Sequence, residues 1–198
     1  MWAAIFSAYL LGSIPFGLII HKLAGRGDIR AHGSGNIGAT NVLRSGGKAA
    51  GIATLILDAG KGVAATLVAR VLSGELSVEA AAAFVSVLGH CYPIWLGFRG
   101  GKGVATACGA YFPLAPVPMT LSLVLFAAVS LTTRIVSLAS LAAGVALPLL
   151  ILWWNPAGAL LLWVVAALVL VVLRHRENIS RLIAGRERRI GVEKERDA

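Results

Sequence analysis

The sequence predicts an all-α membrane protein with seven transmembrane helices. Hydrophobic residues make up 58% of its 198 residues and charged residues only 14%, whereas soluble proteins average roughly 45–50% and about 25%. The mean hydropathy is +0.82, and long apolar runs follow one another along the chain. A soluble domain of this size could not bury so much apolar surface. Lipid must cover it, which excludes a soluble enzyme, a disordered chain and a disulfide scaffold.

Apolar runs between polar breaks define the candidate helices, because a span needs about 20 largely apolar residues. The first run lacks the basic start and cleavage site of a secretory signal, so we expect it to remain as a membrane helix. The breaks are, in order, a basic loop, an acidic turn, a glycine-rich turn, a proline turn, Arg134 and Trp154–Asn155. The fourth run is short, so six spans compete with seven. The runs are residues 2–23, 50–72, 79–97, 104–113, 117–132, 135–153 and 156–173.

The distribution of charge favours seven spans. With Met1 outside and seven crossings, 16 of the 18 Lys and Arg residues fall on one side of the membrane, leaving only Lys61 in a span and Arg70 on the far side. The positive-inside rule makes that side cytoplasmic. Six spans would put Arg134 and the basic tail outside. We therefore predict an outside N-terminus, a cytoplasmic C-terminus and, since no repeat or linker divides residues 1–198, a single domain.

The first loop is rich in glycine and in hydrogen-bond donors. Its glycines match the dinucleotide fingerprint G-x-G-x-x-G, but no strand precedes them, so we reject a dinucleotide site. Glycines allow backbone N–H groups to converge into an anion-binding nest. The alternative is a polar surface loop of turn residues. The candidate ligands are Gly33, Ser34, Gly35, Asn36, Gly38, Thr40, Asn41 and Arg44.

A second glycine-rich segment reads Gly-Phe-Arg-Gly-Gly-Lys-Gly over residues 97–103. It lacks the first glycine and the final Ser or Thr of a nucleotide-binding P-loop. It still places Lys102, between Gly101 and Gly103, among bare amides at the start of the fourth helix, where the helix dipole favours phosphate. The alternative is that Arg99 and Lys102 only determine topology.

The tail supplies a third cluster. His175 and Asn178 are i, i+3 neighbours on one face of a helix, and Glu177 and Arg181 form an i, i+4 pair. The alternative is a basic helix that lies on anionic lipid.

Two pairs of polar residues lie within the spans. Ser137 and Ser140 share a face at the start of the sixth helix, where serines often bond only the i−4 carbonyl. Asp58 and Lys61 are i, i+3 in the second helix, and intramembrane charges are paired or functional. We favour a structural ion pair for them.

The sequence points to no metal or cofactor. Cys91 and Cys108 are seventeen residues apart, with no C-x-x-C and no histidine at ligand spacing, so we interpret them as packed thiols. Seven spans bring the glycine loop, the lysine turn, the two serines and the tail to one membrane face. Many anion donors with few acids predict a site for more than one phosphate.

Four segments carry a family resemblance. They read Gly-Ser-Gly-Asn-Ile-Gly-Ala-Thr-Asn, Leu-Asp-Ala-Gly-Lys-Gly, Gly-His-Cys-Tyr-Pro with Phe-Arg-Gly-Gly-Lys-Gly-Val-Ala-Thr, and Arg-His-Arg-Glu-Asn-Ile-Ser-Arg-Leu. In this order they closely resemble the bacterial acyl-phosphate:glycerol-3-phosphate acyltransferase family. The resemblance implies transfer of an acyl group from acyl phosphate to the sn-1 hydroxyl of glycerol 3-phosphate, giving 1-acylglycerol 3-phosphate and inorganic phosphate. It also implies seven helices in the bacterial inner membrane, with the site facing the cytoplasm.

The resemblance also implies roles for the candidate residues. Ser34, Thr40 and Asn41 would hold acyl phosphate, and a second group would hold glycerol 3-phosphate. Either His175 or a substrate phosphate would be the base. We expect lipid and both substrates as partners, no nucleic acid, and a chain that can act as a monomer. The glycerol 3-phosphate group is Arg44, Lys102, Ser140, His175 and Asn178. Ser137, Glu177 and the glycines complete the set.

A transporter of an organic phosphate is the alternative from another class. It requires a polar path across the bilayer and typically repeated halves. Here the polar clusters share one side, and the halves of the chain do not repeat. The sequence therefore favours the enzyme.

Overall fold

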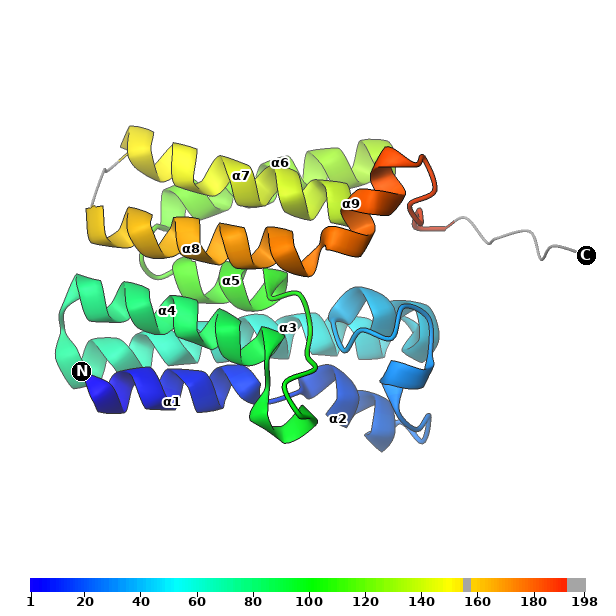
Figure 1. Ribbon diagram of the computed structural model, residues 1–198, viewed down its shortest axis with the longest axis horizontal. Coiled ribbons are helices and arrows are strands. Elements are labelled where there is room, and N and C mark those ends of the chain that lie inside the picture. Colours follow the sequence, from blue (N-terminus) through cyan, green and yellow to red (C-terminus); the bar gives the residue numbers. More distant parts are fainter. Residues whose placement is uncertain (155–157, 192–198) are drawn as a thin grey trace, which may run out of the picture.

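The helices run back and forth between the two ends of a bundle (Figure 1). The computed structural model describes residues 1–154 and 158–191. Within these residues every regular element is a helix. The elements are α1 (Trp2–Ser13), α2 (Phe16–Leu23), η1 (Ile29–Ala31), α3 (Ala39–Ser73), α4 (Leu76–Cys91), η2 (Ile94–Leu96), α5 (Val104–Tyr111), α6 (Pro116–Thr133), α7 (Val136–Trp154), α8 (Gly158–Arg174) and α9 (Arg176–Ile183).

The described residues contain fewer candidate spans than the seven predicted. Five stretches have the length and composition to cross a membrane, and α8 with α9, bent by 62°, is a sixth if the pair counts as one broken span. The prediction of a span at residues 104–113 is wrong, because α5 has 8 residues and is only about 12 Å long. A bilayer core is about 30 Å thick. The glycine-rich turn before α5 occupies residues that a full-length spanning helix would need.

Two other predicted spans differ in detail from the prediction. The first is split into α1 and α2 at Ile14–Pro15, because proline has no N–H group to continue the helix. The second begins at Ala39 rather than at residue 50, and its helix is kinked at Gly47, whose φ is 84° and ψ 172°. The kink separates the polar first turns of α3 from its apolar length.

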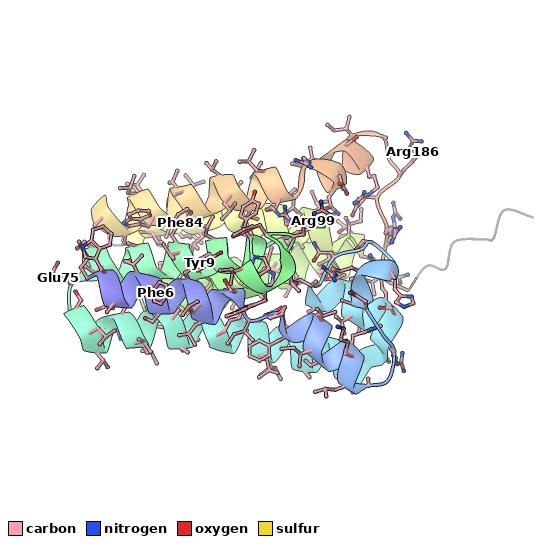
Figure 2. The ribbon with its side chains drawn as sticks, turned by 60° about the horizontal axis from the view of Figure 1, so that its bottom comes forward. Phe6, Tyr9, Glu75, Phe84, Arg99 and Arg186 are labelled. Carbon is pink, nitrogen blue, oxygen red and sulfur yellow. The ribbon has the colours of Figure 1, made fainter. Side chains whose placement is uncertain are left out.

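The two ends of the bundle differ in polarity. Figure 1 places the N-terminus at the end where α3 meets α4, and the loop after α2 together with α9 at the other end. Figure 2 shows nitrogen-bearing side chains gathered mostly at that second end, near Arg186, whereas the helices around Phe6 and Phe84 carry mainly carbon. Opposite ends for the N-terminus and α9 imply an odd number of passes, so the turn before α5 and α5 itself serve as one pass along the bundle although α5 is too short to be a span.

A buried ion pair secures the break between α1 and α2. Lys61 Nζ lies 2.8 Å from Asp58 Oδ1 and donates a 2.7 Å hydrogen bond to the carbonyl oxygen of Ile14. Backbone polar groups in lipid must be satisfied inside the protein. Lys61 provides a donor where proline has interrupted the helix, and Asp58 balances its charge. The pair therefore has the structural task that we expected.

Glycine lets the short helix α5 lie directly on α3. A Cβ atom added at Gly109 would lie 1.9 Å from the carbonyl oxygen of Ala59, and one at Gly62 would lie 2.2 Å from that of Thr106. Small residues allow helix backbones to approach closely in membranes. This contact places the start of α5 against the middle of α3.

We predict that Gly109→Ala destabilises the protein by about 1–3 kcal/mol, because the methyl group would overpack a contact between two backbones. Thermal unfolding of the purified protein in detergent measures the effect. Gly60→Ala is the matched control, since a Cβ there meets no atom within 4 Å. Equal melting temperatures for the two variants would contradict the proposed packing.

Candidate active site

An open cleft of about 390 Å³ lies at the polar end of the bundle. Its walls come from the first loop and the start of α3, from α5 and α6, and from α7, α9 and the chain that follows α9. Most of the predicted site residues line it: Ser34, Asn36, Gly38, Thr40, Asn41, Arg44, Lys102, Ser137, Ser140, His175 and Asn178. Segments far apart in the sequence therefore do converge.

Asn41 organises the glycine loop. Its side-chain oxygen accepts a 2.9 Å hydrogen bond from the backbone N–H of Ser34. Its amide nitrogen donates to the carbonyls of His32 at 3.0 Å and Asn36 at 2.8 Å. The side chain is nearly fully buried, so its amide makes its hydrogen bonds within the loop and not with a ligand. Asn41 shapes the cleft wall and leaves the neighbouring Ser34 and Thr40 to face the cleft.

The loop glycines outside the cleft lining are needed for conformation. Gly33 and Gly35 have φ angles of 61° and 69°, a left-handed conformation that glycine adopts without steric cost. A Cβ atom on Gly33 would also lie 2.2 Å from Asn41 Oδ1. These two residues thus allow the loop to fold around the amide of Asn41.

Glu187, which the sequence analysis did not predict, connects residues of α7 and α9 in the opposite wall of the cleft. It accepts hydrogen bonds from Ser137 Oγ at 3.0 Å, from Asn178 Nδ2 at 2.6 Å and from Arg181 Nε at 2.7 Å. Burial acts to raise the pKa of Glu187, but these bonds hold it below its ordinary value. Gly185, with φ 65°, turns the chain back after α9. This glycine is the one feature of the sequence that could have indicated the turn that brings Glu187 to the cleft.

Lys102 and Asn178 meet across the cleft, because the ammonium group donates to the amide oxygen. Burial lowers the pKa of Lys102 from 10.5 to about 8, since a charged group loses its hydration there. An anion bound beside it would replace that hydration. The lysine can therefore pair with an anion in the cleft.

His175 is held as a neutral imidazole. Its Nδ1 lies 2.8 Å from the carbonyl oxygen of Val171, which can only accept, so Nδ1 carries the hydrogen and Nε2 is an acceptor. Burial lowers the pKa of His175 to about 4. The imidazole is thus neutral at physiological pH and offers one lone pair.

Several predicted residues have other places or partners. The side chain of Glu177 is 75% exposed and lies 3.9 Å from Arg181, so it faces solvent instead of the cleft. Gly101 and Gly103 lie behind the cleft lining. Ser140 donates to the carbonyl of Val136 at 2.9 Å, as the alternative interpretation held. Besides Glu187, the lining residues that we did not predict include Asp58, His90, Arg181 and Arg188.

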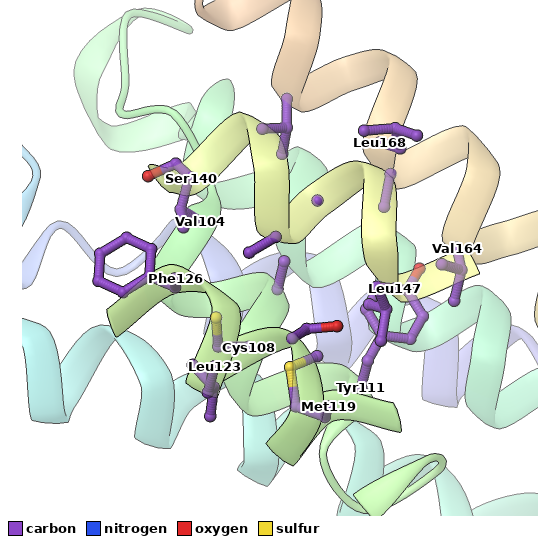
Figure 3. A pocket seen from close by; sticks show the side chains of 16 residues that line it. Val104, Cys108, Tyr111, Met119, Leu123, Phe126, Ser140, Leu147, Val164 and Leu168 are labelled. Carbon is purple, nitrogen blue, oxygen red and sulfur yellow. The ribbon is translucent and has the colours of Figure 1, made fainter. Parts of the chain in front are cut away.

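An apolar cavity extends from the cleft between α5, α6, α7 and α8 (Figure 3). Cys108, Leu123 and Ser140 line both spaces. The polar side chains deeper in the cavity are satisfied by backbone carbonyls, since Tyr111 donates to Trp163 at 2.8 Å and Ser122 donates to Pro118 at 2.9 Å. An apolar cavity of this kind stays dry and accepts hydrocarbon.

Comparison with known proteins identifies the family. The family model for glycerol-3-phosphate acyltransferase matches residues 2–185. The chain belongs to this family. The glycerol-3-phosphate acyltransferase of Cereibacter sphaeroides (strain ATCC 17025) is 50% identical over 190 residues, covering 96% of this chain and 89% of the relative. That of Agrobacterium fabrum is 49% identical over 183 residues, covering 92% and 88%.

Solved structures of the glycerol-3-phosphate acyltransferase family have the same fold. The crystal structure of PlsY (YgiH), an integral membrane glycerol 3-phosphate acyltransferase, in its glycerol 3-phosphate form has a TM-score of 0.91 and 42% identity, covering 96% of this chain and 95% of that one. Its lysophosphatidic acid form has a TM-score of 0.89 and 41% identity, with the same coverage. The comparisons confirm the predicted family, the enzyme class and a multi-pass integral membrane protein.

Proposed function

We propose that this acyltransferase moves a fatty acyl group from acyl phosphate to the sn-1 hydroxyl of glycerol 3-phosphate. The products are 1-acylglycerol 3-phosphate and inorganic phosphate. One observation carries the proposal: a cleft lined by anion donors continues into a cavity lined by hydrocarbon. Such a site accommodates an amphiphile with a phosphate at one end and an acyl chain at the other.

The N-terminus of α3 is the proposed site for the phosphate of the acyl donor. The backbone N–H groups at the start of a helix point outward, and the helix dipole favours negative charge there. Ala39 and Thr40 begin the segment of α3 that precedes the kink at Gly47, and both line the cleft beside Ser34. The loop that Asn41 folds therefore presents hydroxyl groups and free amides to one anion.

Glycerol 3-phosphate takes the facing wall in this proposal. Arg44 and Lys102 supply positive charge, and Asn178 and Ser137 supply polar groups already ordered by Glu187. Two anions must lie close together for the reaction, so their mutual repulsion has to be offset by fixed cations. The similar crystal structure of PlsY is a glycerol 3-phosphate form, which supports the choice of this ligand.

The chemistry needs positioning more than a strong protein base. The sn-1 oxygen bonds to the acyl carbon, the bond from that carbon to the phosphate oxygen breaks, and the hydroxyl proton leaves. With a pKa of about 4, His175 is a weak proton acceptor, since a catalytic pKa belongs near the working pH. A substrate phosphate, with a second pKa near 6, accepts the proton more readily. His175 Nε2 then orients glycerol 3-phosphate by accepting a hydrogen bond from its other hydroxyl group, at sn-2.

The proposed site faces the cytoplasm of a bacterial inner membrane. The loop after α2, the turn before α5 and the chain from Arg174 onward hold most of the basic residues, and basic loops stay on the cytoplasmic side. This orientation gives both water-soluble phosphate and a lipid-borne acyl chain access to the same cleft.

The direct test is phosphate release by purified protein given acyl phosphate and glycerol 3-phosphate. We expect activity in wild type and a loss of about 100-fold or more in Arg44→Ala, because a fixed charge near the reacting phosphates disappears. The exposed Arg99, on the turn before α5, gives the control Arg99→Ala, which should stay within about twofold. Wild-type protein that forms no acylglycerol phosphate would refute the proposal.

The lowered pKa of Lys102 predicts a pH effect on glycerol 3-phosphate binding. The ammonium is charged below about pH 8 and loses its proton above that value, so the KM for glycerol 3-phosphate should rise as pH increases through this range. In Lys102→Arg the rise should disappear, since arginine stays charged. Steady-state kinetics over this pH range measure both. An identical rise in the arginine variant would assign the effect to another group.

The apolar cavity predicts a way to shorten the preferred acyl chain. Gly144 lines it, and a Cβ there would lie 3.4 Å from Leu168, which also lines it, so we expect a larger side chain at this position to take up part of the cavity. Gly144→Leu should lower kcat/KM for long-chain relative to short-chain acyl phosphates by about tenfold, the value of one or two methylene contacts. Lipid-exposed Val145 gives the control Val145→Leu. An unchanged chain-length profile in the glycine variant would place the acyl chain elsewhere.

A further inference from the structure

The Gly100–Gly101 segment, just before Lys102, is held from two sides. On one side the N–H of Gly100 donates to the carbonyl of Cys91 at 3.1 Å, and that of Gly101 donates to His90 at 3.0 Å. On the other side Arg174 donates from Nη2 to the carbonyl of Gly100 at 2.9 Å and from Nε to that of Gly101 at 3.0 Å. All four backbone polar groups of the two glycines are therefore bonded.

The side formed by α4 is rigid and has no spare room. A Cβ atom on Gly101 would lie 1.9 Å from His90 Nε2, and one on Gly100 would lie 2.2 Å from the carbonyl oxygen of His90. The ring of His90 is buried, and its Nδ1 lies 3.6 Å from Asp58. The glycines thus pack against the end of α4, and Arg174 is the side chain that bonds them from the other side.

Arg174 is itself fixed. Its guanidinium carbon lies 5.2 Å from the ring centre of Tyr92, a stacking geometry that favours arginine. The carbonyl of Tyr92 accepts a 2.9 Å hydrogen bond from Tyr9. The guanidinium therefore sits on an aromatic face that α1 and α4 hold in place.

Arg174 also stands at the junction between the two segments that meet at Lys102. It is the last residue of α8, and His175 and Asn178 follow it directly. Lys102 follows Gly101 and contacts Asn178, 76 residues away in the sequence. The two bonds from Arg174 to the glycines therefore connect the end of α8, just before His175, with the turn just before Lys102.

We infer that Arg174 is a positioning residue for the glycerol 3-phosphate subsite. It sets the ammonium of Lys102 against the amide of Asn178, and it acts through the Gly100–Gly101 backbone without touching substrate. The planar fork of arginine bonds two carbonyl oxygens in one fixed geometry, which the ammonium of lysine lacks. The inference rests on the proposed function, because it assigns the lysine and asparagine to one ligand of that reaction.

The test compares Arg174→Gln and Arg174→Lys with wild type in steady-state kinetics. We expect the KM for glycerol 3-phosphate to rise about tenfold or more in both, because small misplacements of binding groups have large effects. The KM for acyl phosphate should stay within about twofold. Arg176→Gln is the matched control, since Arg176 is exposed on the next turn. Equal rises in both KM values would overturn the inference.

A double-mutant cycle shows whether Arg174 works through Lys102. If it does, Arg174→Gln should cost little more in a Lys102→Ala background, because residues that share one interaction are not additive. Additive losses would overturn the inference. So would losses that match only the fall in folded protein, measured by melting temperature in detergent.

Calorimetric binding of glycerol 3-phosphate alone separates this inference from the proposed function. Wild-type protein that binds this ligand but releases no phosphate from acyl phosphate would refute the proposed reaction only. Weaker binding by Arg174→Gln than by Arg176→Gln would then still support the positioning role. Equal binding by the two variants, or no binding by wild type, would refute it.

Discussion

Backbone polar groups that leave water must find partners inside the protein, and this condition applies to the irregular segments that shape the site. Three such segments are each bonded by a side chain that follows them in the sequence. Lys61 supplies a donor at the α1–α2 break, Asn41 bonds the backbone of the glycine loop, and Arg174 bonds the turn before α5. These polar residues make an irregular backbone possible inside a helical bundle.

These side-chain to backbone bonds explain why so apolar a chain contains charged residues inside the bundle. Removing one member of a buried ion pair typically costs about 3–5 kcal/mol, because the other charge is left without compensation. Asp58 and Lys61 must therefore be kept or lost together. Asp58 also lies 3.6 Å from His90, whose ring supports the second glycine-rich turn. One pair thus stabilises the α1–α2 break and stands behind the segment that carries Lys102.

Much of this arrangement could be predicted from the sequence, since hydropathy marks the helices and the motifs mark the clusters. The position of each helix along the bundle could not be predicted. The composition of residues 104–113, for example, does not show that α5 begins part-way through the bundle. The tail shows a similar limit. Helical spacing pairs Glu177 with Arg181, at 3.9 Å in the structure, yet Glu187 lies only 2.7 Å from the same arginine. Local periodicity finds neighbours on one helix, but the partner brought back by a turn depends on tertiary packing.

Asn41 shows why roles are harder to assign than membership of a site. An asparagine beside glycines, serine and threonine looks like a ligand for an anion, and it does line the cleft. Its amide, however, is already bonded to Ser34, His32 and Asn36. Only the folded structure shows which donors remain free.

The same distinction applies to the proposed chemistry: side chains bonded to the protein fix the geometry of the cleft, and those left free are available to substrate. In the proposed reaction acyl phosphate already has a good leaving group, so the barrier would fall mainly through alignment of hydroxyl and carbonyl, which the cleft between these bonded segments would provide.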